Sequence, residues 1–259
     1  MPRVADFLTA RRDAGNKSFA CFVTGGDPPA TELPSILGAL EAGGASLIEV
    51  GLPFSDPIAD GPTIQASSQR ALDRGVRVTE ILGAVKEAAV RVPVITMGYT
   101  NTALRFGFGE FAQMLVSHGV SGALLSDLIP DEGAEWIAAA RDAGLDTVFL
   151  VAPTSTDERI RMACEASTGF VYCVSRTGVT GAESSVPADV GDLVTRVRRF
   201  TSLPVMVGFG ISTNEQVRAV WDVADGAVVG SHIVGFLHEH WKDGAGAAEL
   251  SSLIAGLCR

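Results

Sequence analysis

The stretch PVMVGFGISTNEQVRAVWDVADGAVVGSH, residues 204–232, contains two short apolar runs with a helical pattern between them. The runs PVMVGFG and DGAVVGS are bounded by turn residues and rich in valine, as buried strands are. Between them, NEQVRAVWDVA repeats apolar residues at helical spacing, and Ser212 with Glu215 has the spacing of a capping box. A strand, a helix and a second strand in this order predict a unit with parallel strands.

The same unit recurs along the chain. Six further runs of this kind come before it, at residues 20–26, 46–51, 92–99, 122–127, 146–152 and 169–175. Eight strands that are apolar on both faces and separated by helices predict an α/β protein with a closed (β/α)8 barrel, a TIM barrel. We expect residues 1–259 to form a single domain, with an N-terminal helix and extra helices in the loops.

The alternative architecture is an open, doubly wound sheet. Its usual fingerprint, GxGxxG after the first strand, is missing, because TGGDPP stands at residues 24–29. About 40 residues separate the second run from the third, which is room for two helices. The sequence therefore favours the barrel.

Composition excludes several classes of function. Of the 259 residues 47% are hydrophobic, the net charge is −10, and no run of Lys or Arg could neutralise a row of phosphates, so nucleic acid and anionic membranes are poor partners. No apolar stretch approaches the roughly 20 residues of a membrane helix. The N-terminus MPRVADFLTARRDAG predicts a short amphipathic helix rather than a signal or transit peptide, so we expect a cytoplasmic protein.

Cysteine and histidine give no metal signal. The four cysteines form no CxxC unit, and three of them adjoin predicted strands or helices, so we expect these three to be small buried hydrophobes rather than part of a disulfide framework or a zinc site. His238 and His240 are two residues apart and would point to different faces of a helix. We expect no metal.

Chemically unusual residues follow the predicted strands. The loops after the strands of a barrel form one face, and active sites lie on that face. We expect the following features to share it: Asp27, Glu49, the 52–62 loop, Tyr99, Asn101, Asp127, residues 176–181, residues 208–212, Gly230 and Ser231.

Two glycine-rich loops predict a phosphate site. GFGIS (208–212) and VGSH (229–232) follow the seventh and eighth strands and lead into helices, so backbone N–H groups and a helix dipole can face an anion. The loops after these two strands are the frequent phosphate position in barrels. The alternative is that the glycines only permit tight turns.

Two carboxylates carry the predicted chemistry. Glu49 stands in the apolar run SLIEVG, and if it points inward its pKa is raised by desolvation; the alternative is a structural ion pair. Asp60 lies between Pro57 and Pro62, whose loop could hold it over the barrel mouth; the alternative is a turn residue or a helix N-cap. One group that carries protons beside one kept ionised is a recurrent acid/base arrangement.

Longer motifs carry a family resemblance. IEVGLPFSDPIADGPTIQ (48–65) is followed by YTN (99–101), SRTGVTG (175–181), GFGIS (208–212) and VGS (229–231). From FVTGGDP (22–28) onward, nearly the whole chain resembles the tryptophan synthase alpha chain family. The motifs PFSDPxADGPxIQ and SRxGVTG are specific to that family.

The resemblance implies a lyase of tryptophan biosynthesis. It would cleave indole-3-glycerol phosphate to indole and glyceraldehyde 3-phosphate by a retro-aldol acid/base mechanism, with no cofactor in this chain. Glu49 would be the general acid/base that protonates indole C3 and takes the proton from the glycerol hydroxyl. Asp60 would hydrogen-bond the indole N–H and stabilise the cationic indolenine.

Further site residues are implied by the same resemblance. Substrate would be bound by Phe22, Ile64, Tyr172, Thr180 and Phe209, of which Thr180 belongs to a loop that closes over substrate and contacts Asp60. Phosphate would be bound by Gly181, Gly210, Gly230 and Ser231. Considered one at a time, the apolar positions and Tyr172 would be interpreted as packing.

A partner is implied as well. The family's alpha chain joins a tryptophan synthase beta chain, which holds pyridoxal phosphate, in an αββα heterotetramer, and Pro53, Asp56 and Pro57 would face it. Thr102 and Ile129 stand where the family usually has proline. The alternatives are a stand-alone indole-releasing lyase, a catalytically silent barrel that activates a beta chain, and another phosphate-binding barrel such as a sugar-phosphate epimerase or isomerase.

Overall fold

The computed structural model describes residues 3–174, 188–208, 210–242 and 244–258, and these form eight parallel strands that close into a barrel in chain order. The strands are β1 (Ser18–Thr24), β2 (Leu47–Gly51), β3 (Val94–Gly98), β4 (Gly122–Leu125), β5 (Asp146–Val151), β6 (Phe170–Val174), β7 (Val205–Gly208) and β8 (Gly226–Val229). The last strand pairs with the first, which closes the ring. The (β/α)8 barrel and all eight predicted strands are confirmed.

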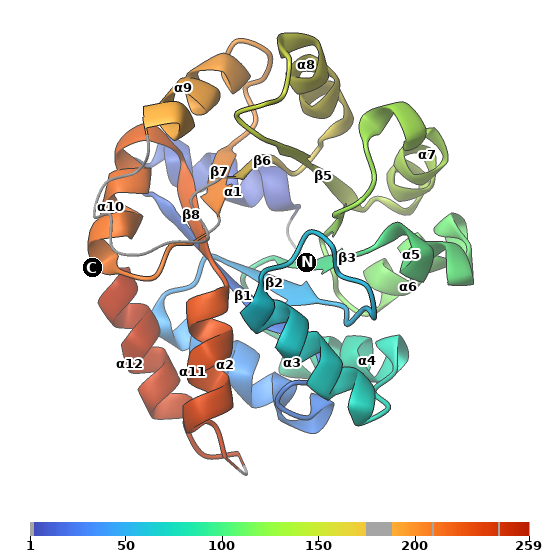
Figure 1. Cartoon of the computed structure of the whole chain (residues 1–259), viewed down its shortest axis with the longest axis vertical. Coiled ribbons are helices and arrows are strands. Elements are labelled where there is room, and N and C mark those ends of the chain that lie inside the picture. The colour runs from blue at the N-terminus through green and yellow to red at the C-terminus, as the bar shows by residue number, and fades with distance from the viewer. Residues whose placement is uncertain (1–2, 175–187, 209, 243, 259) are drawn as a thin grey trace.

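All helices but the first surround the barrel on its outer side, and the first lies across one end (Figure 1). The helices are α1 (Val4–Asp13), α2 (Leu33–Gly43), α3 (Pro62–Asp73), α4 (Val78–Ala88), α5 (Thr100–Phe106), α6 (Phe108–Ser117), α7 (Ala134–Ala143), α8 (Asp157–Ala166), α9 (Ala188–Val197), α10 (Asn214–Val223), α11 (Ser231–His240) and α12 (Ala247–Leu257). Both α3 and α4 lie between β2 and β3, as the long stretch there predicts.

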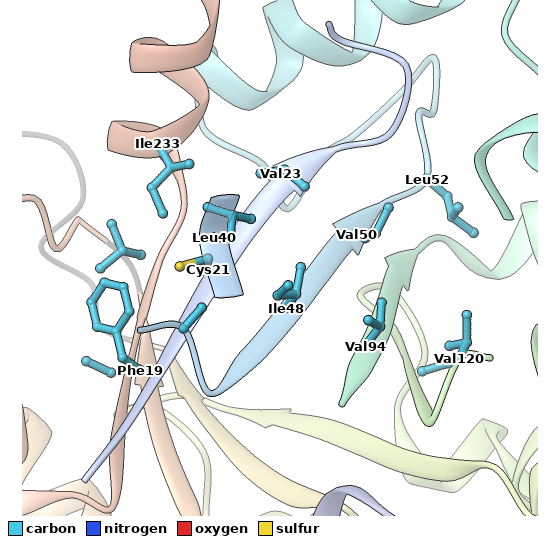
Figure 2. Packing of buried hydrophobic residues seen from close by; sticks show 14 of the residues in the cluster. Phe19, Cys21, Val23, Leu40, Ile48, Val50, Leu52, Val94, Val120 and Ile233 are labelled. Carbon is cyan, nitrogen blue, oxygen red and sulfur yellow. The ribbon is translucent and has the colours of Figure 1, made fainter. Parts of the chain in front are cut away.

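Alternate strand residues face the helices and form the outer core. Figure 2 shows Cys21 and Val23 of β1 beside Ile48 and Val50 of β2, with Leu40 of α2 packed against them. Because the other residues of each strand point inward, both faces of the sheet are buried, which explains the continuous apolar runs in the sequence.

The helix of the opening stretch begins one residue later than predicted. The N-cap of α10 is Thr213, whose Oγ1 accepts the N–H of Gln216 at 3.3 Å, while Gln216 Oε1 accepts the N–H of Thr213 at 3.2 Å. The predicted box of Ser212 and Glu215 is therefore wrong. Thr213 with Gln216 offers the same pair of groups at the same spacing, so the motif alone cannot choose between them.

The first helix closes the N-terminal end of the barrel, and in Figure 1 it lies behind the strands. Val4 and Leu8 of α1 belong to the interior cluster. The buried carboxylate of Asp146, the first residue of β5, accepts the N–H of Val4 at 2.8 Å and forms an ion pair with Arg3. With this end filled, the C-terminal ends of the strands are the open end.

The cysteines and the lengths of the helices were both considered from the sequence. Cys21, Cys164 and Cys173 are buried free thiols, and Cys258 is partly buried. Among the helices of the described ranges, none is long and apolar enough to cross a membrane.

Candidate active site

Glu49 points into the barrel from the middle of β2. Leu47, two residues earlier and therefore on the same face of the strand, belongs to the interior cluster. Glu49 is 2% exposed, and its Oε1 has no hydrogen-bond partner in the described part of the chain. Burial, with a smaller effect of the Asp60 charge, raises the pKa of Glu49 to about 8. The side chain is therefore mostly protonated at neutral pH.

Asp60 lies in the loop between β2 and α3. Its N–H donates to the carbonyl of Pro57 at 3.0 Å, and its own carbonyl accepts from Gln65 Nε2 at 2.8 Å. Its carboxylate does not cap α3, because the N-cap is Gly61 and no described side chain caps that helix. Burial raises the pKa of Asp60 to about 6, and the nearby Tyr99 hydroxyl acts in the opposite direction. Asp60 is therefore mostly ionised at neutral pH.

Tyr172 of β6 is close to both carboxylates. Its pKa is raised well above the ordinary value, first by burial and then by the charges of Glu49 and Asp60. Its ring lies against Gly208, where an added Cβ would be 2.4 Å from the hydroxyl oxygen. Gly208 therefore makes room for the tyrosine beside the two acids.

Phe22, Ile64 and Gly230 meet at the mouth of the barrel. An added Cβ at Gly230 would lie 3.4 Å from Cβ of Phe22 and 3.7 Å from Cδ1 of Ile64. The Phe22 ring packs over Gly51, where a Cβ would lie 2.5 Å from its Cζ. The structure thus brings two of the predicted apolar positions next to one predicted phosphate position.

The two glycine loops precede helix N-termini. Gly230 immediately precedes α11, which begins at Ser231, so the first N–H groups of that helix are at the barrel mouth. Gly210 has a φ of +75°, a backbone conformation that favours glycine. Three predicted site residues, Thr180, Gly181 and Phe209, lie outside the described residues.

The predicted partner-facing residues Pro53, Asp56 and Pro57 lie in the same loop as Asp60, and Ser55 Oγ donates to Asp56 at 2.6 Å. Large apolar side chains are exposed nearby in the same loop, on helix α5 after β3, and on the loop after β4. These are Ile58, which is 85% exposed, and Leu104, Phe106 and Ile129. All four follow β2, β3 or β4, so they belong to one sector of the open end.

Sequence reasoning noted Tyr99 but gave it no role. Tyr99 follows β3, is buried, and its hydroxyl oxygen accepts the N–H of Ala59 at 3.0 Å. The hydroxyls of Thr24 and Ser126, also at strand ends, are buried without a partner among the described residues, and sequence reasoning did not single them out. Their signal in the sequence is position alone: each polar side chain stands at or just after the end of a strand.

Comparisons with known proteins agree with this geometry. A sequence model of the family described as "Tryptophan synthase alpha chain" matches residues 8–255. The tryptophan synthase alpha chain of Geobacter sulfurreducens is 43% identical over 259 residues, covering 99% of this chain and 98% of that one. That of Geotalea daltonii is 48% identical over 220 residues, 84% of this chain and 83% of that one.

Solved structures are similar over the full length. Tryptophan synthase subunit alpha from Legionella pneumophila is superimposed with a TM-score of 0.90 at 30% identity, covering 100% of this chain and 97% of that one. The aminoacrylate-bound form of tryptophan synthase from M. tuberculosis gives a TM-score of 0.87 at 35% identity and covers 100% of both chains.

Proposed function

The chain belongs to the tryptophan synthase alpha chain family, and from that premise we propose that Glu49 and Asp60 are its catalytic residues. The chain is a carbon–carbon lyase of tryptophan biosynthesis, which cleaves indole-3-glycerol phosphate to indole and glyceraldehyde 3-phosphate. The assignment of these residues rests on one observation: a buried and a half-buried carboxyl group lie at the barrel mouth, and the first is mostly protonated and the second mostly ionised at neutral pH.

The reaction needs an acid first. Indole becomes a leaving group only after protonation at C3, and Glu49, with a pKa of about 8, holds a proton to donate. Protonation places positive charge on the ring nitrogen. Asp60 is ionised, has an Oδ1 atom without a partner in the described ranges, and can accept the indole N–H and stabilise this cation.

Bond cleavage then needs a base. Glu49, now a carboxylate, takes the proton of the glycerol hydroxyl, the carbonyl of glyceraldehyde 3-phosphate forms, and the bond to C3 breaks. The bonding electrons return to the indole ring and neutralise its nitrogen. Glu49 ends protonated, as it began, so every proton is accounted for by groups of the chain and the substrate. The proposal therefore requires no cofactor in this chain.

Substrate binding follows the layout of the mouth. Phe22, Ile64 and Tyr172 provide apolar surface for the indole beside the two acids. The N-terminus of α11, after Gly230 and with Ser231 as its first residue, offers N–H groups to the phosphate together with the Gly210 loop. The family resemblance adds Thr180 and Phe209 to the substrate site and Gly181 to the phosphate site.

The partner of this chain is a tryptophan synthase beta chain, as membership of the family implies. We place the contact on the sector that contains Pro53, Asp56 and Pro57, because the exposed apolar side chains follow β2, β3 and β4 there. An αββα complex, with pyridoxal phosphate held by the beta chain, is part of the proposal. So are a cytoplasmic location and the action of the whole chain as one catalytic domain.

The test is the rate of indole formation from indole-3-glycerol phosphate, measured with the chain alone and with an added beta chain. Glu49→Gln keeps the size of the side chain and removes the acid, so it should abolish the reaction in both conditions. Glu87→Gln, an exposed substitution at the far end of α4, is the matched control and should leave the rate unchanged.

The outcomes separate the alternatives. A low rate alone that rises with the beta chain supports the proposal. A high rate that ignores the beta chain indicates a stand-alone lyase. If the Glu49→Gln variant kept the full rate, the catalytic assignment would be wrong.

A further inference from the structure

Tyr99 connects two strand ends at the mouth. It follows β3, and its side chain crosses to the loop after β2, where its ring stacks on Phe54 with the centroids 4.8 Å apart and the planes at 17°. Its hydroxyl oxygen accepts the N–H of Ala59 at 3.0 Å. One buried side chain therefore contacts the Asp60 loop at two points, six residues before the catalytic aspartate and directly beside it.

The hydroxyl of Tyr99 lies beside Asp60. Because its oxygen already accepts a hydrogen bond from Ala59, the residue before Asp60, its own O–H is free to donate, and the Asp60 carboxyl is the neighbouring acceptor that we infer for it. Burial first, and then the charge of Asp60, raise the pKa of Tyr99 above its ordinary value, so the hydroxyl keeps its proton throughout the working range. Asp60 Oδ1 has no partner among the described residues, so it is free to accept a hydrogen bond from the substrate.

The structure assigns Tyr99 as the positioning residue of Asp60: its hydroxyl holds the carboxylate ionised and turned toward the indole nitrogen. The residue does not contact the reacting carbon. It acts through Asp60, so the inference rests on the role given to Asp60 in the proposed function. A donor to a buried carboxylate stabilises the charged form, which is the form that must meet the cationic indolenine.

Other ionisable groups lie near Tyr99 and Asp60, and the test variants leave them unchanged. Glu49 reaches them from β2 and Tyr172 from β6. Asp127, after β4, adds a smaller charge effect on Tyr99, and its own carboxylate accepts the N–H of Thr100 at 2.7 Å. Where they are ionised, Glu49 and Asp127 disfavour further negative charge at the mouth, which increases the need for a donor to Asp60.

The experiment follows the Asp60 carboxyl carbon by NMR during a pH titration of the free protein, with Asp60→Asn to assign the signal. Tyr99→Phe keeps the ring and removes the hydroxyl. We expect the pKa of Asp60 to rise in this variant. For a rise of about one unit from about 6, the ionised fraction at pH 6 falls from about one half to about one tenth. Phe54→Leu removes the stacking partner and retains the hydroxyl, so it should leave the pKa in place.

A second experiment measures kcat/KM against pH for the same variants. In Tyr99→Phe the acid limb of kcat/KM should move to higher pH, with a loss of about fivefold at pH 6 and little loss at pH 8. A merely structural role would lower kcat/KM equally at all pH values. An unmoved Asp60 titration in Tyr99→Phe would overturn the inference, whatever the rates. If Tyr99→Phe shifts the pKa of Asp60 but the unmodified protein does not cleave indole-3-glycerol phosphate, the positioning role of Tyr99 is supported and the proposed catalytic roles are refuted.

Discussion

Glu49 and Asp60 lie together at the barrel mouth, the first buried and the second half-buried, and burial brings the pKa of Glu49 to about 8 and that of Asp60 to about 6. Asp60 is less buried than Glu49, and the nearby Tyr99 hydroxyl offsets part of its desolvation. The two acids are thereby separated in titration, as acid/base pairs require.

A bell-shaped pH dependence follows from this separation. The reaction needs Asp60 ionised and Glu49 protonated, so kcat/KM should rise through a pKa near 6 and fall through one near 8. Because the groups interact, the two apparent values belong to the pair. The measurement is kcat/KM for indole formation between pH 5 and pH 9.5. A profile that is flat from pH 6 to pH 9 would contradict these roles.

The same burial makes the fold sensitive to pH. Glu49 has a raised pKa in the folded state, so between its unfolded value, near 4.5, and about 8 the folded protein binds more protons than the unfolded chain. Stability therefore falls as pH rises through this window and levels off above it. Glu49→Gln removes this contribution and should raise the melting temperature more at pH 8 than at pH 5. Thermal unfolding at both pH values tests this, and an equal shift at both would refute it.

Gly208 is required by Tyr172. Any Cβ at this position meets the Tyr172 hydroxyl at 2.4 Å, and the ring is enclosed in the interior cluster. Gly208→Ala should displace the ring toward the acids and lower kcat/KM roughly tenfold or more, as small displacements in active sites do. Gly83→Ala, with open space around it on α4, is the control and should stabilise the helix without loss of activity. Steady-state kinetics and circular dichroism distinguish the two.

The Asp146 contacts keep α1 in place. Asp146→Ala removes the buried acceptor of the Val4 N–H and the partner of Arg3, so it should lower the free energy of unfolding by about 3 kcal/mol. Asp142→Ala, an exposed substitution on α7, should change it by less than about 0.5 kcal/mol. Urea denaturation measures both. Equal effects of the two substitutions would show that the closure of the barrel end by α1 contributes little.

The exposed apolar sector should bind the beta chain. Ile58→Ser removes a large side chain that is 85% exposed, and we expect it to weaken the complex roughly tenfold without lowering the stability of the free chain. Val116→Ser, near the C-terminal end of α6 and hence at the opposite end of the barrel, is the matched control. Titration of the beta chain by calorimetry gives both affinities. Equal affinities would place the interface elsewhere.

The strands of this protein, and the burial of Glu49, can be predicted from short stretches of sequence. The runs 204–210 and 225–231 were recognisable as strands because a strand buried on both faces must be apolar at every position. The apolar neighbours of Glu49 likewise predicted its burial, since strand residues share the environment of their neighbours. The site positions themselves came from motif resemblance, and the structure brings Glu49, Asp60 and Tyr172 together.

Only the tertiary structure decided the remaining points. The sequence left Asp60 open between a helix N-cap and a carboxylate over the mouth, because both require the same residue at the same place. Its loop is held by Tyr99, whose hydroxyl oxygen accepts the N–H of Ala59 from 40 positions away in the chain, and no periodicity encodes that contact. The position of α1 beneath the barrel likewise depends on Asp146, which lies more than 140 residues away. Secondary structure follows from short-range patterns, whereas hydrogen-bond partners and ionisation states depend on which side chains the closed barrel brings within reach.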